Sequence, residues 1–507
     1  MKTDLAPEAI LKMWNVDEIS TASGGERRGN ASVEVTGVSI DTRTLRPGDL
    51  FVAVKGPRFD GHDFVAQALE RGASGAIVSR PEFQAREGAW RPLLDRHFLT
   101  LVDDPLTALQ ALATWHRMRF DVPLIGVTGS NGKTTTKEMI AAILSRRGPV
   151  LKTEGNLNNH LGLPLSLLRL DASHRAAVLE IGISFKGEMR RLCEIARPTI
   201  GLITNIGPAH LEFLGSIEGV AEEKGSLFEA VRSDGTAIIN LNDPHLAPWE
   251  KRLSNSLENK AAARKWTFAL DAPADVTATE IRPEGAEIGF LLTLRRTGES
   301  GRIHLATSGR HQVANALGAA AVACALGYRL EEIREGLAAF RPVALRAEVL
   351  EAEGKTILLD AYNANPASMK AAIEMLAAFP RREGGSSRKI ALLGDMLELG
   401  TFSEAAHRGI GEAAAQNGID LLIAVGRWAG AMAEGARQAG MAGEKISAHA
   451  DLPSFQKAFL SSVRKGDVLL IKGSRGMRME TVLAWLGVER SDRGKRTETL
   501  PQERGKG

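Results

Sequence analysis

Cysteine is scarce in this sequence, and long apolar runs are absent from it. The two cysteines, Cys193 and Cys324, lie far apart in apolar stretches, which favours two buried core thiols in a reducing compartment over a disulfide or a metal site. No apolar run reaches the roughly 18 residues of a membrane span. Acidic residues near the N-terminus argue against a signal peptide, which needs a basic and then an apolar segment. We therefore expect a cytoplasmic protein that does not insert into a membrane.

A strong excess of charge of either sign is missing as well. The 64 Lys and Arg residues nearly balance the 61 Asp and Glu residues, for a formal charge of +3. This balance argues against nucleic acid or an anionic membrane as the main partner, so any phosphate must be bound locally. Hydrophobic residues make up 44% and charged residues 25%, so we expect a packed core. At roughly 100–200 residues per domain, a chain of 507 residues is expected to form about three domains, and we expect it to be a monomer.

Three regions differ in their pattern of apolar residues. Residues 1–105 have mixed strand and helix signals, and residues 106–342 contain continuous apolar strands that are typical of a parallel sheet buried on both faces. Residues 343–490 alternate apolar strands with helical segments, which predicts a doubly wound, Rossmann-like parallel sheet. The predicted strands of this last region are 357–360, 390–394, 421–425 and 468–472, with a weaker candidate at 445–448. Residues 491–507 lack apolar periodicity, and we expect a disordered tail. The predicted fold class is therefore α/β with three domains.

The strongest motif lies between a predicted strand at 122–127 and a predicted helix. Its sequence is Gly-Val-Thr-Gly-Ser-Asn-Gly-Lys-Thr-Thr-Thr, residues 126–136. Strand, glycine loop, Lys-Thr and helix form the context of a phosphate loop, in which backbone N–H groups surround phosphate oxygens, Lys133 neutralises negative charge and the Thr134 hydroxyl can bind Mg²⁺. One position departs from the usual spacing, since Val127 stands where a glycine is expected. The motif predicts that the central domain is similar to phosphate-loop ATPases.

Polar residues after other strands are candidates for the rest of a phosphate and metal site. Glu180 ends a predicted strand and His210 follows the next, so we expect both at the sheet edge where the loop lies. Each has an ordinary alternative, a solvated glutamate and a satisfied surface or core histidine. Lys224, by its spacing alone, is a charged residue on a helix face. In the last region, Asp360 and Lys472 also end strands and predict a polar binding edge.

Several motifs together resemble the Mur ligases, the ATP-dependent amide ligases of peptidoglycan precursor synthesis. The matching segments are residues 41–43, 128–137, 154–159, 205–210, 309–317, 360–366, 393–400 and 472–475. The Tyr-Asn-Ala-Asn-Pro element at 362–366 and the Gly-Asp-Met-Leu-Glu-Leu-Gly element at 394–400 are most similar to the branch of the family that adds D-alanyl-D-alanine. Gln312 and the Leu-Asp-Ala element at 359–361 depart from the common family pattern.

The resemblance implies roles for specific positions. The ATP site would comprise Thr128, Gly129, Ser130, Asn131, Gly132, Lys133, Thr134 and Thr135 of the loop, together with Asn315, Arg346, Asp360 and Tyr362. Two Mg²⁺ ions would be bound by Thr134, Glu180, His210 and Lys224, the lysine as a carbamate formed with CO₂. The catalytic residues would be Lys133, His210 and Lys224. In the N-terminal domain Asp41, Thr42 and Arg43 would bind the UDP moiety, and Asn156, Asn158 and Asn159 would also contact the substrate.

The resemblance also implies a reaction, in which ATP drives the joining of D-alanyl-D-alanine to the terminal carboxylate of UDP-N-acetylmuramoyl-tripeptide through an acyl phosphate. This chemistry needs no protein nucleophile, and the sequence has no Gly-x-Ser-x-Gly motif. We expect the C-terminal domain to close over the central domain when ligands bind. Two alternatives stay open. One is another amide ligase of the family with a different amino substrate, such as a tripeptide synthetase or a folylpolyglutamate synthase, and the other is a nucleotide-binding scaffold without catalysis.

Overall fold

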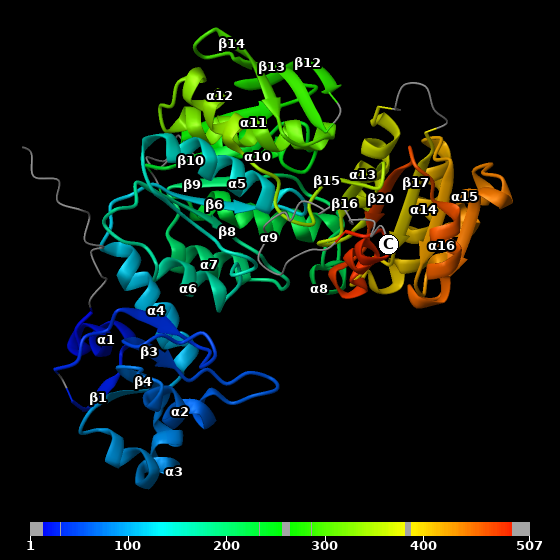
Figure 1. Cartoon of the computed structure of the whole chain (residues 1–507). Helices are drawn as coiled ribbons and strands as arrows, with labels where there is room; N and C mark the ends of the chain where they lie inside the picture. Colours follow the sequence, from blue (N-terminus) through cyan, green and yellow to red (C-terminus); the bar gives the residue numbers. More distant parts are fainter. Residues whose placement is uncertain are drawn as a thin grey trace, which may run out of the picture.

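The computed structural model describes residues 14–488, apart from residues 31, 233, 256–263, 285 and 381–386. Three sheets follow one another along the chain, and Figure 1 shows the N-terminal sheet below the central one and the C-terminal sheet beside it. The predicted α/β class with three domains is confirmed. The predicted tail at 491–507 lies outside the described residues. Of the helices described, none is both long and apolar enough to cross a membrane.

The first sheet has the strand order β1-β5-β4-β3-β2, in which only the β1–β5 pairing is antiparallel. Its strands are β1 (Glu26–Gly29), β2 (Gly37–Ser39), β3 (Asp49–Val52), β4 (Gly75–Ser79) and β5 (Phe98–Val102), and its helices are α1 (Val16–Ser23), α2 (Val65–Glu70) and α3 (Arg80–Trp90). Alternate residues of β3 and β4 belong to two different apolar clusters, with Val52 and Ile77 in one and Phe51 and Ala76 in the other. Both faces of the sheet are therefore covered, as the period of two along a strand requires.

Helix α4 (Pro105–Met118) connects the first two sheets. Asp104 accepts hydrogen bonds from the first turn, and a proline occupies the first helical position, where no N–H partner is needed. Leu109 of α4 packs in the same apolar cluster as Leu50 of the first sheet and Leu124 of the central sheet. A continuous core thus joins the N-terminal and central sheets, and Figure 1 shows α4 between them.

The central sheet has nine strands in the order β14-β13-β12-β11-β10-β9-β6-β8-β7, and all pairings from β12 to β7 are parallel. Its strands are β6 (Leu124–Thr128), β7 (Val150–Lys152), β8 (Ala176–Glu180), β9 (Ile200–Ile203), β10 (Thr236–Asn240), β11 (Arg264–Ala269), β12 (Val276–Glu284), β13 (Glu287–Leu294) and β14 (Glu299–Leu305). Its helices are α5 (Lys133–Leu144), α6 (Gly162–Leu167), α7 (Glu188–Ala196), α8 (Leu211–Leu214), α9 (Ile217–Ala230), α10 (Ala247–Asn255), α11 (Arg310–Ala325) and α12 (Leu330–Ala339).

Strand β6 lies inside this sheet and is buried along its whole length. Ile125 and Val127 pack in the cluster that contains α5 and α11, whereas Leu124 packs in the cluster that contains α6, α7 and α9. Burial on both faces explains the continuous apolar run from which this strand was predicted. Because β6, β8 and β9 are parallel neighbours, the residues that follow them meet at one sheet edge.

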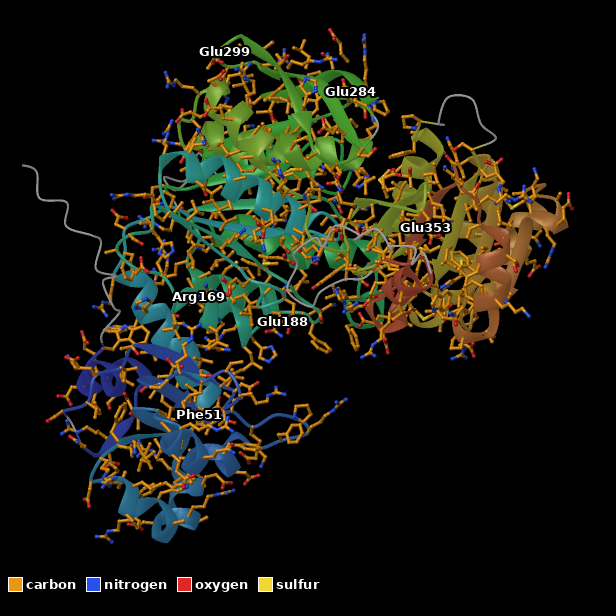
Figure 2. All side chains as sticks on the ribbon, viewed as in Figure 1. Phe51, Arg169, Glu188, Glu284, Glu299 and Glu353 are labelled. Carbon is orange, nitrogen blue, oxygen red and sulfur yellow. The ribbon has the colours of Figure 1, made fainter. Side chains whose placement is uncertain are left out.

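Strands β7 and β10 to β14 of the central sheet are not among the predicted elements. The pairings β12–β13 and β13–β14 are antiparallel, and the burial of β13 alternates along much of its length. Exposed positions along β12 and β14 interrupt the continuous apolar pattern that marks β6. Glu284 and Glu299, which are labelled in Figure 2, belong to β12 and β14. These strands lie at the opposite end of the molecule from Phe51 of the first sheet.

The C-terminal sheet has the order β15-β16-β20-β17-β18-β19, with every pairing parallel except β15–β16. Its strands are β15 (Glu348–Ala352), β16 (Lys355–Asp360), β17 (Lys389–Gly394), β18 (Leu421–Val425), β19 (Ile446–His449) and β20 (Val468–Lys472), and its helices are α13 (Pro366–Ala378), α14 (Ser403–Gln416), α15 (Ala429–Gln438), α16 (Gln456–Ser462) and α17 (Val482–Trp485). The five predicted strands correspond to β16–β20, and the antiparallel edge strand β15 was not predicted.

Both cysteines are free, as predicted. Cys193 is buried on α7, but Cys324 is only partly buried, so the prediction of two buried thiols was wrong for the second. Cys324 lies near the end of α11, where it packs at the margin of an apolar cluster. Burial raises the pKa of both thiols to about 12, so neither is a reactive thiolate near neutral pH.

Candidate active site

The predicted phosphate loop lies between the end of β6 and the start of α5. Two of its glycines have positive φ, +142° at Gly129 and +80° at Gly132. A Cβ at Gly129 would lie 1.9 Å from Thr204 Oγ1, and one at Gly132 would lie 2.3 Å from Asn315 Oδ1. Both positions therefore require glycine for conformation and for space. The unusual Val127 is a buried residue of β6, so it belongs to the strand and leaves the strand–loop–helix path intact.

A second loop, which follows β9, braces the phosphate loop. The Ser130 N–H donates to the Asn205 carbonyl oxygen at 2.9 Å, and the Asn131 N–H donates to Asn205 Oδ1 at 3.0 Å. The Ser130 hydroxyl exchanges hydrogen bonds with the backbone of Gly207, at 2.9 and 3.0 Å. These contacts hold the backbone of the phosphate loop in place.

Lys133, the first residue of α5, folds back over the loop. Its Nζ donates a hydrogen bond to the Gly129 carbonyl oxygen at 2.8 Å. Burial lowers the pKa of Lys133, the Glu180 carboxylate opposes that shift, and the charge of Arg346 adds to it. Two cations from different domains thus converge on the loop, an arrangement suited to the negative charge of a triphosphate.

Glu180 lies beside the loop, as its position at a strand end predicts. Its carboxylate accepts a hydrogen bond from Thr134 Oγ1 at 2.7 Å and another from Asn158 Nδ2 at 2.9 Å. Its side chain is buried. Thr135 and Thr136 are also buried in the first turn of α5, and the Thr136 hydroxyl lacks a hydrogen-bond partner within the described residues. The loop and the end of β8 therefore share one polar centre.

His210 and Lys224 are the other two predicted metal ligands. His210 precedes α8 in the left-handed conformation, with φ of +55°, and its buried Nδ1 lacks a hydrogen-bond partner among the described residues. Burial and the charges of Lys224 and Lys133 lower the pKa of His210 to about 4. Lys224 of α9 is 2% exposed, and burial together with the charge of Lys133 lowers its pKa to about 7. The fold therefore gathers Lys133, His210 and Lys224, and it leaves His210 uncharged near neutral pH.

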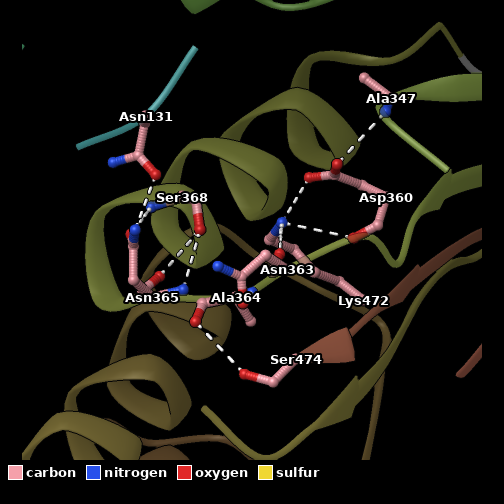
Figure 3. Close-up of polar contacts among 9 residues, drawn as sticks. All are labelled: Asn131, Ala347, Asp360, Asn363, Ala364, Asn365, Ser368, Lys472 and Ser474. Carbon is pink, nitrogen blue, oxygen red and sulfur yellow. Dashed lines mark hydrogen bonds and ion pairs between the residues drawn. The ribbon is translucent and has the colours of Figure 1, made fainter. Parts of the chain in front are cut away.

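Three predicted ATP contacts come from the C-terminal domain. The Arg346 guanidinium lies over the Tyr362 ring, with Cζ 3.9 Å from the ring centre, and its Nε is buried without a partner among the described residues. Asp360 instead accepts a hydrogen bond from Lys472 Nζ at 2.5 Å and one from the Ala347 N–H at 3.3 Å (Figure 3). Asp360 is therefore held by its own domain, and its contact with ATP stays a prediction.

Asn315 of α11 lies against the last glycine of the loop. Its Nδ2 donates to Gln312 Oε1 at 3.0 Å, so its Oδ1 is the atom that faces Gly132. Gln312, which departs from the family pattern, therefore orients the predicted adenine-contacting amide. This contact was not apparent from the sequence. It arises because residues three positions apart are neighbours on one face of a helix, and because α11 packs against α5.

The residues predicted to bind UDP lie in the N-terminal domain. Arg43 pairs with Asp41 through two parallel contacts, at 2.9 and 2.6 Å, and this pairing lowers the pKa of the Asp41 carboxyl. Thr42 Oγ1 donates to Gln67 Oε1 at 3.1 Å. The Arg43 side chain is 86% exposed and so remains open to a ligand.

Asn156 and Asn159 are exposed residues in the loop that follows β7. Asn159 Oδ1 accepts a hydrogen bond from the Gly162 N–H at 2.9 Å and so supports the start of α6. Asn158, their neighbour, turns toward Glu180. The structure thus brings Asn158 to the phosphate site, whereas the substrate contacts of Asn156 and Asn159 stay predictions.

Sequence reasoning assigned no individual role to Asn205, Asn365 or Glu398, all of which reach the site. Asn205 braces the loop, Asn365 binds Asn131 from the C-terminal domain, and Glu398 Oε2 lies 3.5 Å from His210 Nδ1. Each follows a parallel strand, which is the signal that could have pointed to them. Only tertiary packing selects them from the many polar residues at strand ends, within the central domain for Asn205 and between the two domains for Asn365 and Glu398.

Replacing Gly132 by alanine is expected to weaken ATP binding by about tenfold, the scale of one hydrogen bond to a charged group. The new Cβ would displace Asn315 and strain the loop backbone. Titration calorimetry with ATP measures the effect. Gly440→Ala is the matched control, since Gly440 has a similar φ of +90° but nothing within 4 Å of an added Cβ. Equal ATP affinities of the two variants would contradict the role assigned to Gly132.

Three family models match this chain. They are "Mur ligase family, catalytic domain" at residues 34–113, "Mur ligase middle domain" at residues 127–323, and "Mur ligase, glutamate ligase domain" at residues 345–475. The chain is 37% identical to a UDP-N-acetylmuramoyl-tripeptide–D-alanyl-D-alanine ligase of Escherichia coli over 471 residues, which cover 92% of this chain and 97% of that protein.

Solved structures agree with these matches. The fold is similar to that of MurF from Acinetobacter baumannii, with a TM-score of 0.83, 32% identity and coverage of 94% of this chain and 99% of that one. It is also similar to a MurF ligase from Thermotoga maritima in complex with ADP, with a TM-score of 0.72, 29% identity and coverage of 89% and 96%.

Proposed function

Because this chain belongs to the Mur ligase family, we propose that it is the ATP-dependent ligase that joins D-alanyl-D-alanine to UDP-N-acetylmuramoyl-tripeptide in peptidoglycan precursor synthesis. The observation that carries the proposal is the similarity to ligases of this name over 89% and 92% of the chain, at 36% and 37% identity. The phosphate loop, with Lys133 and Glu180 beside it, supplies the matching chemistry.

The reaction needs activation, because a carboxylate and an amine do not form an amide at neutral pH. The terminal carboxylate of the tripeptide attacks the γ-phosphorus of ATP, the bond to the ADP oxygen breaks, and an acyl phosphate forms. The amine of D-alanyl-D-alanine then attacks the acyl carbon, phosphate leaves and the nitrogen loses a proton. The protein must bring two anions together, and Lys133 and Arg346 reduce the repulsion between them.

Four residues would hold the Mg²⁺ ions, namely Thr134, Glu180, His210 and Lys224. The donor set fits a metal, because Glu180 and Thr134 are in contact and the buried Nδ1 of His210 makes no hydrogen bond within the described residues, where Glu398 Oε2 lies 3.5 Å from it. Over the described residues, no three His, Cys, Asp or Glu side chains form a metal-binding group. The proposed set relies on the Thr134 hydroxyl and on Lys224 in addition to Glu180 and His210. When bound, Mg²⁺ would neutralise charge on the phosphate chain.

Lys224 would take part as a carbamate. A free ammonium repels a metal ion, whereas attack of the uncharged amine on CO₂ forms an N–C bond, releases a proton and yields an anionic ligand. The pKa of about 7 leaves much of Lys224 as uncharged amine near neutral pH. This supports carbamylation that increases as the pH rises through 7.

The remaining roles follow the domains. The pair Asp41–Arg43 with Thr42 would bind the UDP moiety in the N-terminal domain, and Asn315 would contact adenine from α11. The C-terminal domain would contribute Arg346 and Tyr362 to the ATP site, and it would bind the amine substrate. Each of these assignments is supported by the position of the residue in the fold and by the family resemblance.

The test is the release of ADP by the purified full chain with ATP, Mg²⁺ and UDP-N-acetylmuramoyl-tripeptide. D-Alanyl-D-alanine is expected to stimulate ADP release, whereas single amino acids, or folate with glutamate, are not. Stimulation by a single amino acid in place of the dipeptide would assign the chain to another ligase of the family. ATP binding without turnover on any of these substrates would indicate a scaffold.

A further inference from the structure

One side chain of the C-terminal domain holds a side chain of the phosphate loop. Asn365 Nδ2 donates a hydrogen bond to Asn131 Oδ1 at 2.7 Å, across 234 residues of sequence (Figure 3). Asn365 ends the Tyr-Asn-Ala-Asn segment and immediately precedes α13. The two residues are therefore in contact only because the C-terminal domain lies against the central one.

The orientation of the Asn365 amide is set by its own helix. Asn365 is the N-cap of α13, and its Oδ1 accepts a hydrogen bond from the Ser368 N–H at 2.9 Å. The Ser368 hydroxyl in turn accepts from the Asn365 N–H at 3.0 Å. With its oxygen engaged by the helix, Asn365 can present only its NH₂ group to the loop.

The orientation of the Asn131 amide follows from this contact. The backbone of Asn131 is clamped by Asn205, which accepts from its N–H at 3.0 Å and donates to its carbonyl oxygen at 3.1 Å. Only the side chain can turn, and its oxygen faces the donor on Asn365. In Figure 3 the dashed line to Asn365 starts from the Asn131 oxygen and not from its nitrogen. An N–H donor of the loop, two residues before Lys133, is thus left available for an acceptor.

We propose that Asn365 is a positioning residue that orients the Asn131 amide so that Asn131 Nδ2 donates a hydrogen bond to the terminal phosphoryl group of ATP. The inference rests on the proposed function, since it concerns the phosphoryl group that the ligase transfers. Without the C-terminal domain, the Asn131 amide is free to turn its oxygen toward the phosphate, which repels it. Docking of this domain therefore completes the loop, and activation of the acid is coupled to the arrival of the domain that binds the amine substrate.

A second contact of the same domain agrees with this coupling. Glu398, on the loop after β17, places Oε2 3.5 Å from His210 Nδ1. The C-terminal domain thus reaches both the phosphate loop and a proposed metal ligand of the central domain.

Two substitutions of Asn365 separate positioning from stability. Asp caps a helix about as well as Asn, so Asn365→Asp keeps the contact with Ser368 but replaces the donor that faces Asn131 by an acceptor. The Asn131 amide is then expected to rotate so that its nitrogen faces the new carboxylate and its oxygen faces the phosphate. Asn365→Ala removes both the donor and the cap of α13, and it serves as the reference for a purely structural loss.

The experiment measures binding of a non-hydrolysable ATP analogue and of ADP by calorimetry, together with thermal unfolding without ligand. For Asn365→Asp we expect wild-type thermal stability, unchanged ADP affinity and about tenfold weaker binding of the analogue, the loss of one hydrogen bond to a charged group. Steady-state turnover should show a lower kcat with an unchanged KM for D-alanyl-D-alanine. In an Asn131→Ala background, Asn365→Asp should no longer change the affinity for the analogue.

Two results would overturn the proposal. One is an Asn365→Asp variant that binds the analogue as tightly as the wild type, or loses ADP affinity to the same extent. The other is thermal stability as low as that of Asn365→Ala, which would make the role structural. The binding measurements need no turnover, so they decide the role of Asn365 even if the wild type fails to respond to D-alanyl-D-alanine and the proposed function fails.

Discussion

Replacing Lys133 by alanine is expected to lower substrate-dependent ADP release by about a thousandfold, the upper range for one lost electrostatic contact to a transition state. Lys133 is the cation of the phosphate loop, and its Nζ lies 2.8 Å from the Gly129 carbonyl oxygen. In the reaction a carboxylate approaches a triphosphate. In the variant, the positive charge of Lys133 no longer reduces the repulsion between these two anions. Initial rates of ADP release at saturating substrates measure the loss.

The matched control for Lys133 is Lys370→Ala, which removes an exposed lysine of α13 and should retain wild-type turnover. Thermal unfolding of the Lys133 variant should remain close to that of the wild type, because within the described residues the Lys133 side chain donates a hydrogen bond to the Gly129 carbonyl oxygen and belongs to no apolar cluster. Turnover within tenfold of the wild type would contradict the role given to Lys133.

Replacing Lys224 by alanine is expected to lower turnover by at least about a hundredfold, since even an outer partner of a metal ligand typically contributes 10–100-fold. If Lys224 acts as a carbamate, short carboxylic acids such as formate or acetate should enter the space left by the side chain and partly restore the rate. The measurement is ADP release by Lys224→Ala as a function of added acid at constant ionic strength.

The Lys224 test carries its own control, because the same acids should not restore Lys133→Ala, in which a cation is missing. A second readout is the pH dependence of CO₂ incorporation into the wild-type chain. Burial and Lys133 lower the pKa of Lys224 to about 7, so the uncharged amine, and with it incorporation, should increase from below pH 7 to above it. If no small acid restores the rate, the proposed carbamate on Lys224 is contradicted, whereas the ligase assignment is not affected.

Local patterns predicted much of this protein because the relevant residues are neighbours in the chain. The continuous apolar run of β6 indicates a strand buried on both faces, and the Gly-Lys-Thr sequence after it indicates a phosphate loop. The α/β alternation of the C-terminal domain likewise follows from short segments. Strands β14 and β15 escaped prediction because exposed polar positions interrupt their apolar pattern.

The sequence by itself determined the α/β class, the phosphate loop with Lys133 and Thr134, the strand end that carries Glu180 and the loop after the next strand that carries His210. Only the tertiary structure decided the environment of Lys224, which spacing alone describes as a charged residue on a helix face but which packing buries to 2% exposure. It also decided which asparagine orients Asn131 and which lysine pairs with Asp360. These properties depend on desolvation and on contacts between residues far apart in the chain, and both arise only when helices and domains pack against one another.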